Sequence, residues 1–394
     1  KIYITRYLIN KYSLINRSSN AMLVLKKRTK RTKIFILSSL VLLVFIAGVP
    51  INIDPFVRTK KEVNALHLSG EWTLGDITIT GNWSSTISQD WCFYENGSYI
   101  IENVTCGSIF ITNTTEAFQI RNCVFYSMSY STNRGIVLRN ASNGIIRDNI
   151  NWNCTYGVQM IDGSNITISN NIFLDSSEYI YLIGASSVRV ENNDIIVADY
   201  GWGIFMTDSN DIWIAGNHIN GNARPCYGIY ALVSDMIIYN NSFSDLSSGI
   251  EIITYNCTIS ENIISDCTNP IQALNSFIFS IINNDIKRAG DIGIEFLECG
   301  DGQISHNRLQ NIRNEGIYLE RTNFTTVFNN TIQSQLNCIK QVECEGNTIE
   351  NNSCQIISSS IVLGYEMIVV MLGVSILIGV TIILKKRSSN KILY

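Results

Sequence analysis

The sequence predicts an all-β solenoid, in which similar coils of short parallel strands and tight turns are stacked on one another. Three observations carry this prediction. Two apolar motifs recur with a shared period of about 22 residues, both alternate apolar and other residues over only a few positions, and residues 70–355 lack any long stretch with helical spacing. Short alternating runs bounded by Asn, Gly, Asp or Ser are typical of strands with one buried face.

The first motif is apolar-x-x-Asn-x-apolar. It stands as Ile168-Ser-Asn-Asn171-Ile-Phe173 and returns with its Asn at Asn193, Asn217, Asn241, Asn262, Asn284, Asn307 and Asn330. Asn347 is the expected last copy, Asn149 belongs to an imperfect early one, and Cys123 takes the Asn place before it. Coils of equal length place Asn on Asn at one turn, where a left-handed backbone is tolerated. We therefore expect this Asn to serve the fold and not a ligand.

The second motif is Gly-apolar-x-apolar, as in Gly135-Ile-Val-Leu138 and Gly249-Ile-Glu-Ile252, and it keeps the same period. Tyr179, Pro270 and Cys338 replace the Gly in three copies. Alternation points the x residue outward. Read along the coils, the x residues are Val137, Gln159, Tyr181, Phe205, Tyr230, Glu251, Gln272, Glu295, Tyr318 and Lys340.

These coils resemble the right-handed parallel β-helix proteins of the pectin-lyase-like superfamily, and among them the NosD-type and "carbohydrate-binding and sugar-hydrolase" repeat group. The resemblance covers about residues 116–352 and implies a right-handed parallel β-helix solenoid of about ten coils. Enzymes of this superfamily carry Asp clusters with calcium and an Arg or Lys base, or paired Asp with Gly-His-Gly, and this sequence has neither Gly-His-Gly nor Asp-Asp. NosD-type proteins imply copper handling, but His67, His218 and His306 are far apart and the Met residues do not cluster. We therefore expect no metal site.

The outward column is the candidate binding site. Aromatic rings beside polar groups suit sugar rings. Trp202 lies close to this column in the sequence. The residues expected to bind a glycan are Tyr181, Phe205, Tyr230, Gln272 and Tyr318. The alternative is a solvated strand face whose aromatic residues only pair across strands.

Glu251 and Glu295 are the candidate catalytic residues. They are two coils apart, which separates their backbones by roughly 9.6 Å, near the upper end of the roughly 6.5–9.5 Å used by inverting glycosidases. No cofactor is expected. Calcium is the ion that an acidic protein could attract, although no Asp-rich loop with calcium-ligand spacing is present.

Composition and charge exclude two classes of protein. The chain is 46% hydrophobic and 16% charged, which argues against disorder. Residues 1–33 carry 10 Lys or Arg and no acid, and residues 385–394 carry four more. Residues 34–384 are left with 15 basic and 33 acidic residues, so they should repel phosphate backbones. We expect no nucleic-acid partner.

Both ends have the character of membrane-topology signals. The basic segment 1–33 precedes an apolar segment at 34–50, which is expected to be a signal peptide or a signal anchor. Met22 stands before the basic run, so residues 1–21 are excluded from the fold prediction. Residues 361–384 are apolar except for Glu366 and suit one transmembrane helix. The basic tail 385–394 would then be cytoplasmic.

The domain order follows from these features: irregular N-terminal coils and a cap at 54–115, β-helix repeats at 116–352, the transmembrane helix and the tail. Eleven Cys fit an oxidising exterior, with Cys257/Cys267 or Cys338/Cys344 as plausible bridges. Twelve Asn-x-Ser/Thr sequons between Asn82 and Asn351 suggest a glycoprotein.

The predicted function is a cell-membrane protein with its β-helix outside, acting as a surface binding or structural module for a glycan. The alternative is a polysaccharide hydrolase or lyase. A scaffold without a ligand is the third interpretation.

Overall fold

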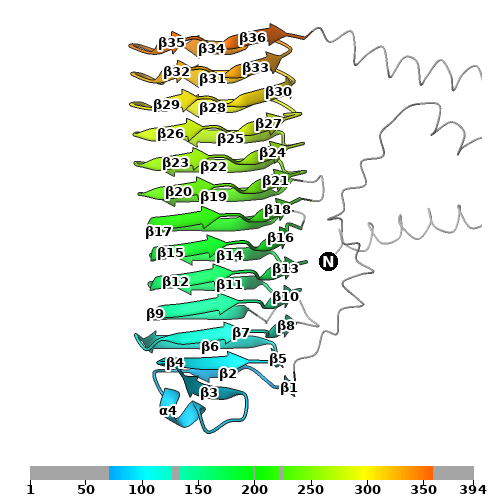
Figure 1. The fold of residues 1–394 in the computed structure, drawn as a ribbon, viewed down its shortest axis with the longest axis vertical. Coiled ribbons are helices and arrows are strands. Elements are labelled where there is room, and N and C mark those ends of the chain that lie inside the picture. Colours follow the sequence, from blue (N-terminus) through cyan, green and yellow to red (C-terminus); the bar gives the residue numbers. More distant parts are fainter. Residues whose placement is uncertain (1–70, 127–133, 199, 222–224, 358–394) are drawn as a thin grey trace, which may run out of the picture. The chain divides into compact units, whose positions relative to one another are not determined.

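In a computed structural model, which describes residues 71–126, 134–198, 200–221 and 225–357, the chain winds into a right-handed parallel β-helix (Figure 1). Each coil contributes strands to three sheets. Among the described strands, all pairings are parallel except one N-terminal hairpin. The predicted all-β parallel solenoid is therefore confirmed.

Sheet A has 13 strands: β1 (Trp72–Thr73), β5 (Val104–Cys106), β8 (Val124–Tyr126), β10 (Ile150–Trp152), β13 (Ile172–Leu174), β16 (Asp194–Ile196), β18 (His218–Asn220), β21 (Ser242–Ser244), β24 (Ile263–Ser265), β27 (Asp285–Lys287), β30 (Arg308–Ile312), β33 (Thr331–Ser334) and β36 (Ser353–Ile356). The stack thus extends beyond the repeats at both ends.

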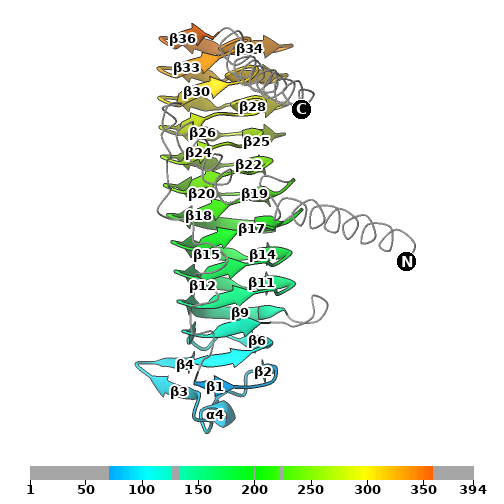
Figure 2. The same ribbon diagram turned by 90° about the vertical axis from the view of Figure 1, so that its right-hand side faces the viewer.

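Sheet B is built from β2 (Ile77–Ile79), β6 (Ser108–Thr114), β9 (Gly135–Arg147), β11 (Tyr156–Ile161), β14 (Glu178–Ile183), β17 (Trp202–Ala215), β19 (Tyr227–Val233), β22 (Ser248–Thr254), β25 (Asn269–Leu274), β28 (Ile294–Leu297), β31 (Ile317–Glu320) and β34 (Ile339–Val342). Figure 2 shows many of these strands stacked along one side of the β-helix.

Sheet C contains β4 (Ser98–Glu102), β7 (Phe118–Arg121), β12 (Ser164–Ser169), β15 (Ser186–Glu191), β20 (Met236–Tyr239), β23 (Cys257–Ser260), β26 (Phe279–Ile282), β29 (Gln303–Ser305), β32 (Thr326–Phe328) and β35 (Thr348–Glu350). The long strands β9 and β17 run from sheet B into sheet C. The antiparallel hairpin joins β3 (Cys92–Glu95) to β4.

The core consists of apolar columns inside the three sheets. The first apolar residue of the Asn motif forms one of them, and every member is fully buried: Ile120, Ile146, Ile168, Val190, Ile214, Ile238, Ile259, Ile281, Ile304 and Val327. Burying each such side chain contributes roughly 1.5–3 kcal/mol relative to leaving it exposed. The repeat therefore folds because each coil buries its apolar residues on those of the next.

A ladder of asparagines follows this column. In each rung the backbone N–H and the side-chain Nδ2 donate to Oδ1 of the next Asn at 2.9–3.1 Å, from Asn149 through to Asn352. Nδ2 also donates to a core carbonyl of the preceding coil, as Asn171 does to Ile146. The predicted fold role of the Asn is confirmed.

Two details of the Asn prediction are wrong. The positive φ belongs to the residue before the ladder Asn, such as Asn170 (54°) or Asn240 (52°), because the ladder side chain must point into the turn. The last rung is Asn352 and not Asn347, because Ile349 is in register with Val327.

The two ends of the stack differ. At the N-terminal end, α4 (Trp83–Thr86) and the β3–β4 hairpin cover the coils (Figure 1). Trp83 is 1% exposed, stacks on Tyr99 with centroids 4.8 Å apart, and donates from Nε1 to Thr114 Oγ1 at 3.0 Å. At the other end, apolar side chains such as Leu336 (54%) and Ile356 (51%) stay exposed.

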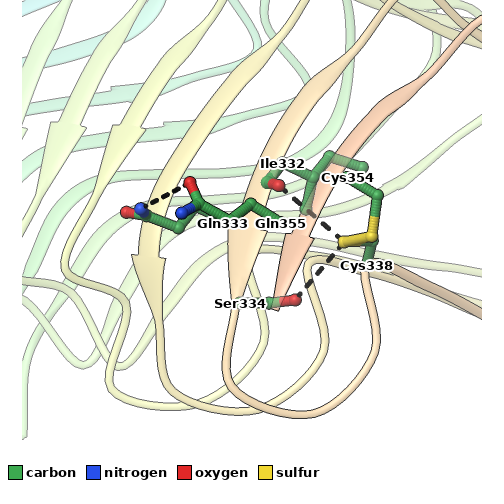
Figure 3. The surroundings of a disulfide bond; sticks show 6 residues. All are labelled: Ile332, Gln333, Ser334, Cys338, Cys354 and Gln355. Atoms are coloured by element: carbon green, nitrogen blue, oxygen red, sulfur yellow. Dashed lines mark hydrogen bonds between the residues drawn. A yellow bond between two sulfur atoms is a disulfide. The ribbon is translucent and has the colours of Figure 1, made fainter. Parts of the chain in front are cut away.

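Both predicted cysteine bridges are wrong. The one disulfide among the described residues joins Cys338 to Cys354 of β36, beside Gln333 and Gln355 (Figure 3). Cys257 and Cys267 are buried thiols in different columns, and Cys344 is a half-buried thiol. Their Sγ atoms lie among apolar side chains and backbone carbonyls, where Cys acts as a small hydrophobic residue. These cysteines therefore serve mainly to pack the core and not to form disulfides.

The predicted apolar segments 34–50 and 361–384 lie outside the described residues. Within the described ranges, no helix is long and apolar enough to cross a membrane.

Candidate functional site

The outer face of sheet B carries the predicted column. All ten x residues are direct partners from strand to strand, from Val137 in β9 to Lys340 in β34. Val137 and Gln159 are buried, at 0% and 6% exposure, although alternation pointed them outward. The members from Tyr181 to Tyr318 are half-buried, and Lys340 is exposed. Register thus brings together all seven predicted site residues.

A second column lies beside the first on the same face. It contains Tyr156, Glu178, Trp202, Tyr227, Ser248 and Asn269, which pair in this order. Sequence reasoning noted Trp202 and missed Tyr156, Glu178 and Tyr227. The missed signal was the residue directly before the motif Gly, as in Tyr156-Gly157 and Tyr227-Gly228. We call the two columns together the sheet B strip. It consists of the second column, from Tyr156 to Asn269, and of the part of the first column that runs from Gln159 to Tyr318.

The aromatic rings of the strip form a ladder. Tyr181 and Phe205 stack with centroids 4.8 Å apart and planes 9° apart, and Phe205 stacks on Tyr230 at 5.6 Å and 8°. Both faces of Phe205 are therefore covered by neighbouring rings, and it turns an edge outward. Trp202 is tilted by 46° to Phe205, and Tyr156 by 58° to Tyr181. Offset and tilted pairs of this kind stabilise the sheet by roughly 0.5–1.5 kcal/mol each.

The two candidate catalytic carboxylates are coupled through the strand between them. Gln272 on β25 donates from Nε2 to Glu295 Oε2 at 2.6 Å. Burial raises the pKa of Glu251, and the charge of Glu295 raises it further. Gln272 thus lies between Glu251 and Glu295, where the glycosidic bond of a substrate would have to fit.

Tyr318 is held by the last coils. Its hydroxyl donates to Glu320 Oε2 at 2.8 Å, and the Lys340 ammonium lies 5.2 Å from its ring centroid. Lys340 also pairs with Glu315 at 3.1 Å. The cation at this end of the strip is therefore already neutralised.

An open groove borders the strip at the turn between sheets B and C. It has a volume of about 550 Å³, and its walls include Leu232, Ile253, Tyr255 and Phe277. Leu232 and Ile253 follow Tyr230 and Glu251 by two residues on the same strands, so groove and strip form one surface. Across the described ranges, no group of three or more His, Cys, Asp or Glu side chains is arranged to hold a metal ion.

The comparisons with known proteins agree with this architecture. The family model for the right-handed β-helix region matches residues 65–202, 107–230 and 202–354. The chain belongs to this right-handed β-helix family. A search of curated proteins found no match.

This β-helix is similar in fold to several solved structures. A periplasmic alginate epimerase, AlgG, shares 13% identity at a TM-score of 0.47, covering 72% of this chain and 84% of its own. The catalytic domain of a GH87 α-1,3-glucanase in complex with nigerose shares 12% at 0.46, covering 72% and 68%. A polygalacturonase from Erwinia carotovora shares 13% at 0.43, covering 73% and 96%.

In this β-helix the strip offers hydrogen-bond acceptors beside aromatic rings. Its carboxylates are Glu178, Glu251 and Glu295, and its amides are those of Gln159, Asn269 and Gln272. Such a mixture of apolar rings and few fixed polar groups is typical of ligand-binding surfaces.

Proposed function

We propose that this β-helix is a surface module that binds a glycan along the sheet B strip. The observation that supports the proposal is the continuity of the strip, in which six aromatic side chains of adjacent coils, Tyr156, Tyr181, Trp202, Phe205, Tyr227 and Tyr230, run into the polar group Glu251, Gln272 and Glu295. Sugar C–H groups pack on aromatic surfaces, and sugar hydroxyls pair with carboxylates and amides. An elongated ligand lying along the stacked coils would meet both kinds of group.

We place the module outside the cell and anchored in the cell membrane. The support comes from the apolar length of residues 361–384 and from the basic residues that follow them. The proposed helix would begin shortly after β36, which ends at Ile356.

The second candidate function is a polysaccharide hydrolase or lyase. It is favoured by the raised pKa of Glu251 beside the carboxyl of Glu295, since a general acid with a raised pKa is what glycoside cleavage requires. It is disfavoured by the Gln272–Glu295 hydrogen bond, which fills the space between the two carboxyls.

The test uses the full chain in detergent with immobilised neutral, acidic and amino polysaccharides, with and without calcium. If the strip binds a glycan, we expect the immobilised polysaccharide to retain the wild type without release of new reducing ends. We expect it to retain Tyr230→Ala more weakly. Release of sugar ends that disappears in Glu251→Gln would establish the enzyme and overturn the binding proposal. The absence of both retention and release would leave a scaffold.

A further inference from the structure

We propose that the ligand of the strip is a glycan with free amino groups, and that Glu178 and Gln159 bind an ammonium group of it. This inference rests on the proposed glycan binding and adds the chemical class of the sugar. The candidate site is the part of the strip formed by Tyr156, Gln159, Glu178, Tyr181 and Trp202.

Two buried acceptors in this part of the strip lack a partner. Glu178 Oε2 and Gln159 Oε1 are both buried and accept no hydrogen bond from any described residue. Gln159 is only 6% exposed. Unsatisfied buried acceptors are costly, at about 1–3 kcal/mol each, and therefore need an explanation.

Both acceptors belong to residues that interact with Tyr156. Tyr156 pairs with Glu178, and Gln159 pairs with Tyr181, across the same two strands, β11 and β14. The Gln159 amide is hydrogen-bonded to the Tyr156 phenol, and the Glu178 charge raises the pKa of both Tyr156 and Tyr181. The carboxylate of Glu178 and the amide of Gln159 therefore both lie beside the Tyr156 side chain, in the same part of the strip.

Aromatic rings surround the acceptors. Tyr156 and Tyr181 have centroids 5.3 Å apart, and Trp202 follows Glu178 in its column. Rings of Tyr and Trp attract cations through their quadrupoles. The surroundings of Glu178 thus favour a positive group over a negative one.

The charge of Glu178 is not compensated by any residue in the part of the chain that the structure describes. It makes no ion pair with a described Lys or Arg. Arg134 lies near enough to lower the pKa of Tyr156, but it does not pair with Glu178. Burial raises the pKa of Glu178, which is the signature of a carboxylate that lacks a counter-charge.

An ammonium group matches this set of atoms. It has three donors and no acceptor, so it can donate to either oxygen without bringing a competing acceptor, and it neutralises the carboxylate. A uronate would place a second carboxylate against Glu178, and like charges repel. A neutral sugar could donate a hydroxyl to one of the oxygens and would leave the charge uncompensated.

The test measures binding of three defined oligosaccharides of equal length to the full chain by calorimetry, at a pH where the amine is protonated. They are a glucosamine oligomer, its N-acetylated form and an oligogalacturonate. We expect the glucosamine oligomer to bind at least about tenfold more tightly than the N-acetylated form, because a hydrogen bond to a charged group is worth about 1.5–3 kcal/mol. Glu178→Gln should abolish this preference, and Gln159→Met should reduce it.

The matched control is Glu350→Gln, an exposed carboxyl on sheet C, which should leave the preference intact. Circular dichroism checks that each variant is folded, and Gln159→Met serves as the second variant if Glu178→Gln is not. Equal binding of the glucosamine and N-acetylated oligomers, or a preference that survives Glu178→Gln, would overturn the inference and leave glycan binding in place. Absence of binding to all three and to the wider panel would refute the proposed function itself.

Discussion

Single asparagines hold each coil to the next. Asn241 accepts hydrogen bonds from the backbone N–H and Nδ2 of Asn217 and donates to the carbonyl of Ile214. It is 2% exposed, so water cannot replace these bonds. Each rung therefore satisfies groups on two neighbouring coils at once.

Replacing one rung should be costly. Asn241→Ala removes the acceptor of the Asn217 backbone N–H, one of the acceptors of Asn217 Nδ2 and the donor to the carbonyl of Ile214. We expect the free energy of unfolding to fall by about 3 kcal/mol. Urea unfolding followed by circular dichroism measures this loss. Asn240→Gly is the matched control, because Asn240 has a φ of 52° that glycine adopts without strain. Similar losses in the two variants would contradict the assignment of the ladder.

Glu178 should reduce stability at neutral pH. Burial raises the pKa of its carboxyl above the unfolded value, so the folded state binds more protons between the two pKa values. Stability then falls as pH rises through this window, and the loss persists at higher pH. Glu178→Gln should therefore unfold at a higher temperature than the wild type at pH 7. The difference should vanish below a pH of about 4, where the unfolded carboxyl is also protonated. Glu350→Gln should show neither effect, and a destabilised Glu178→Gln at pH 7 would contradict the account.

At the scale of the strand, the glycine of the second motif has a steric origin. A Cβ on Gly228 would lie 2.4 Å from the carbonyl oxygen of Gly249 in the next coil, and one on Gly203 would lie 2.7 Å from that of Gly228. In these two coils the carbonyl oxygen of the next coil leaves no room for a side chain at the bend, whereas Tyr179, Pro270 and Cys338 are accommodated at this position in other coils. This steric limit explains why a Gly stands at the bend, directly before the alternating residues that form sheet B.

Adding a single methyl group at this bend should disturb the stack. We expect Gly228→Ala to lower the free energy of unfolding by about 1–3 kcal/mol, the usual cost of overpacking. Gly75→Ala is the control, because a Cβ there meets nothing within 4 Å. Thermal unfolding of the two variants measures the difference, and an unaffected Gly228→Ala would show that the backbone can shift at no cost.

The ring ladder links the strand to the candidate site. Because Phe205 is covered on both faces, its contribution is mainly to the stability of sheet B. For Phe205 the structure thus favours the alternative interpretation of the outward column, in which aromatic residues pair across strands and bind no ligand. The ligand contacts proposed here fall on the other aromatic rings of the strip and on the acceptors around them.

At the scale of the whole molecule, the described residues cover one end of the stack and leave the other end open. The covered end is formed by α4 and the β3–β4 hairpin, and the open end by β35 and β36 with the Cys338–Cys354 disulfide. The proposed membrane anchor follows the open end in the sequence.

The anchor can be tested in cells. We expect the full chain to resist carbonate extraction and residues 51–357, secreted behind a cleavable signal peptide, to be released, because residues 361–384 suffice to cross the hydrocarbon core. A tag after Tyr394 should be protected from external protease, while the β-helix is labelled from outside. Release of the full chain, or cleavage of the tag from outside, would refute the topology.

The sequence alone determined the parallel solenoid, its period, the register of the outward column and the fold role of the ladder Asn. It could do so because every coil repeats the same local pattern, so a residue and its neighbour in space are separated by one period. The sequons show the limit of local patterns: Asn103, Asn140 and Asn165 all sit at positive φ, so turn geometry alone explains such Asn residues.

Only the tertiary structure decided what departs from the repeat. The Cys338–Cys354 pairing, the last rung at Asn352 and the burial of Val137 and Gln159 depend on the end of the stack and on what covers a face. The unpartnered oxygens of Glu178 and Gln159 depend on side-chain positions across two strands. A repeat pattern predicts the column in which a residue lies. Whether a buried acceptor receives a hydrogen bond depends on its neighbours in three dimensions.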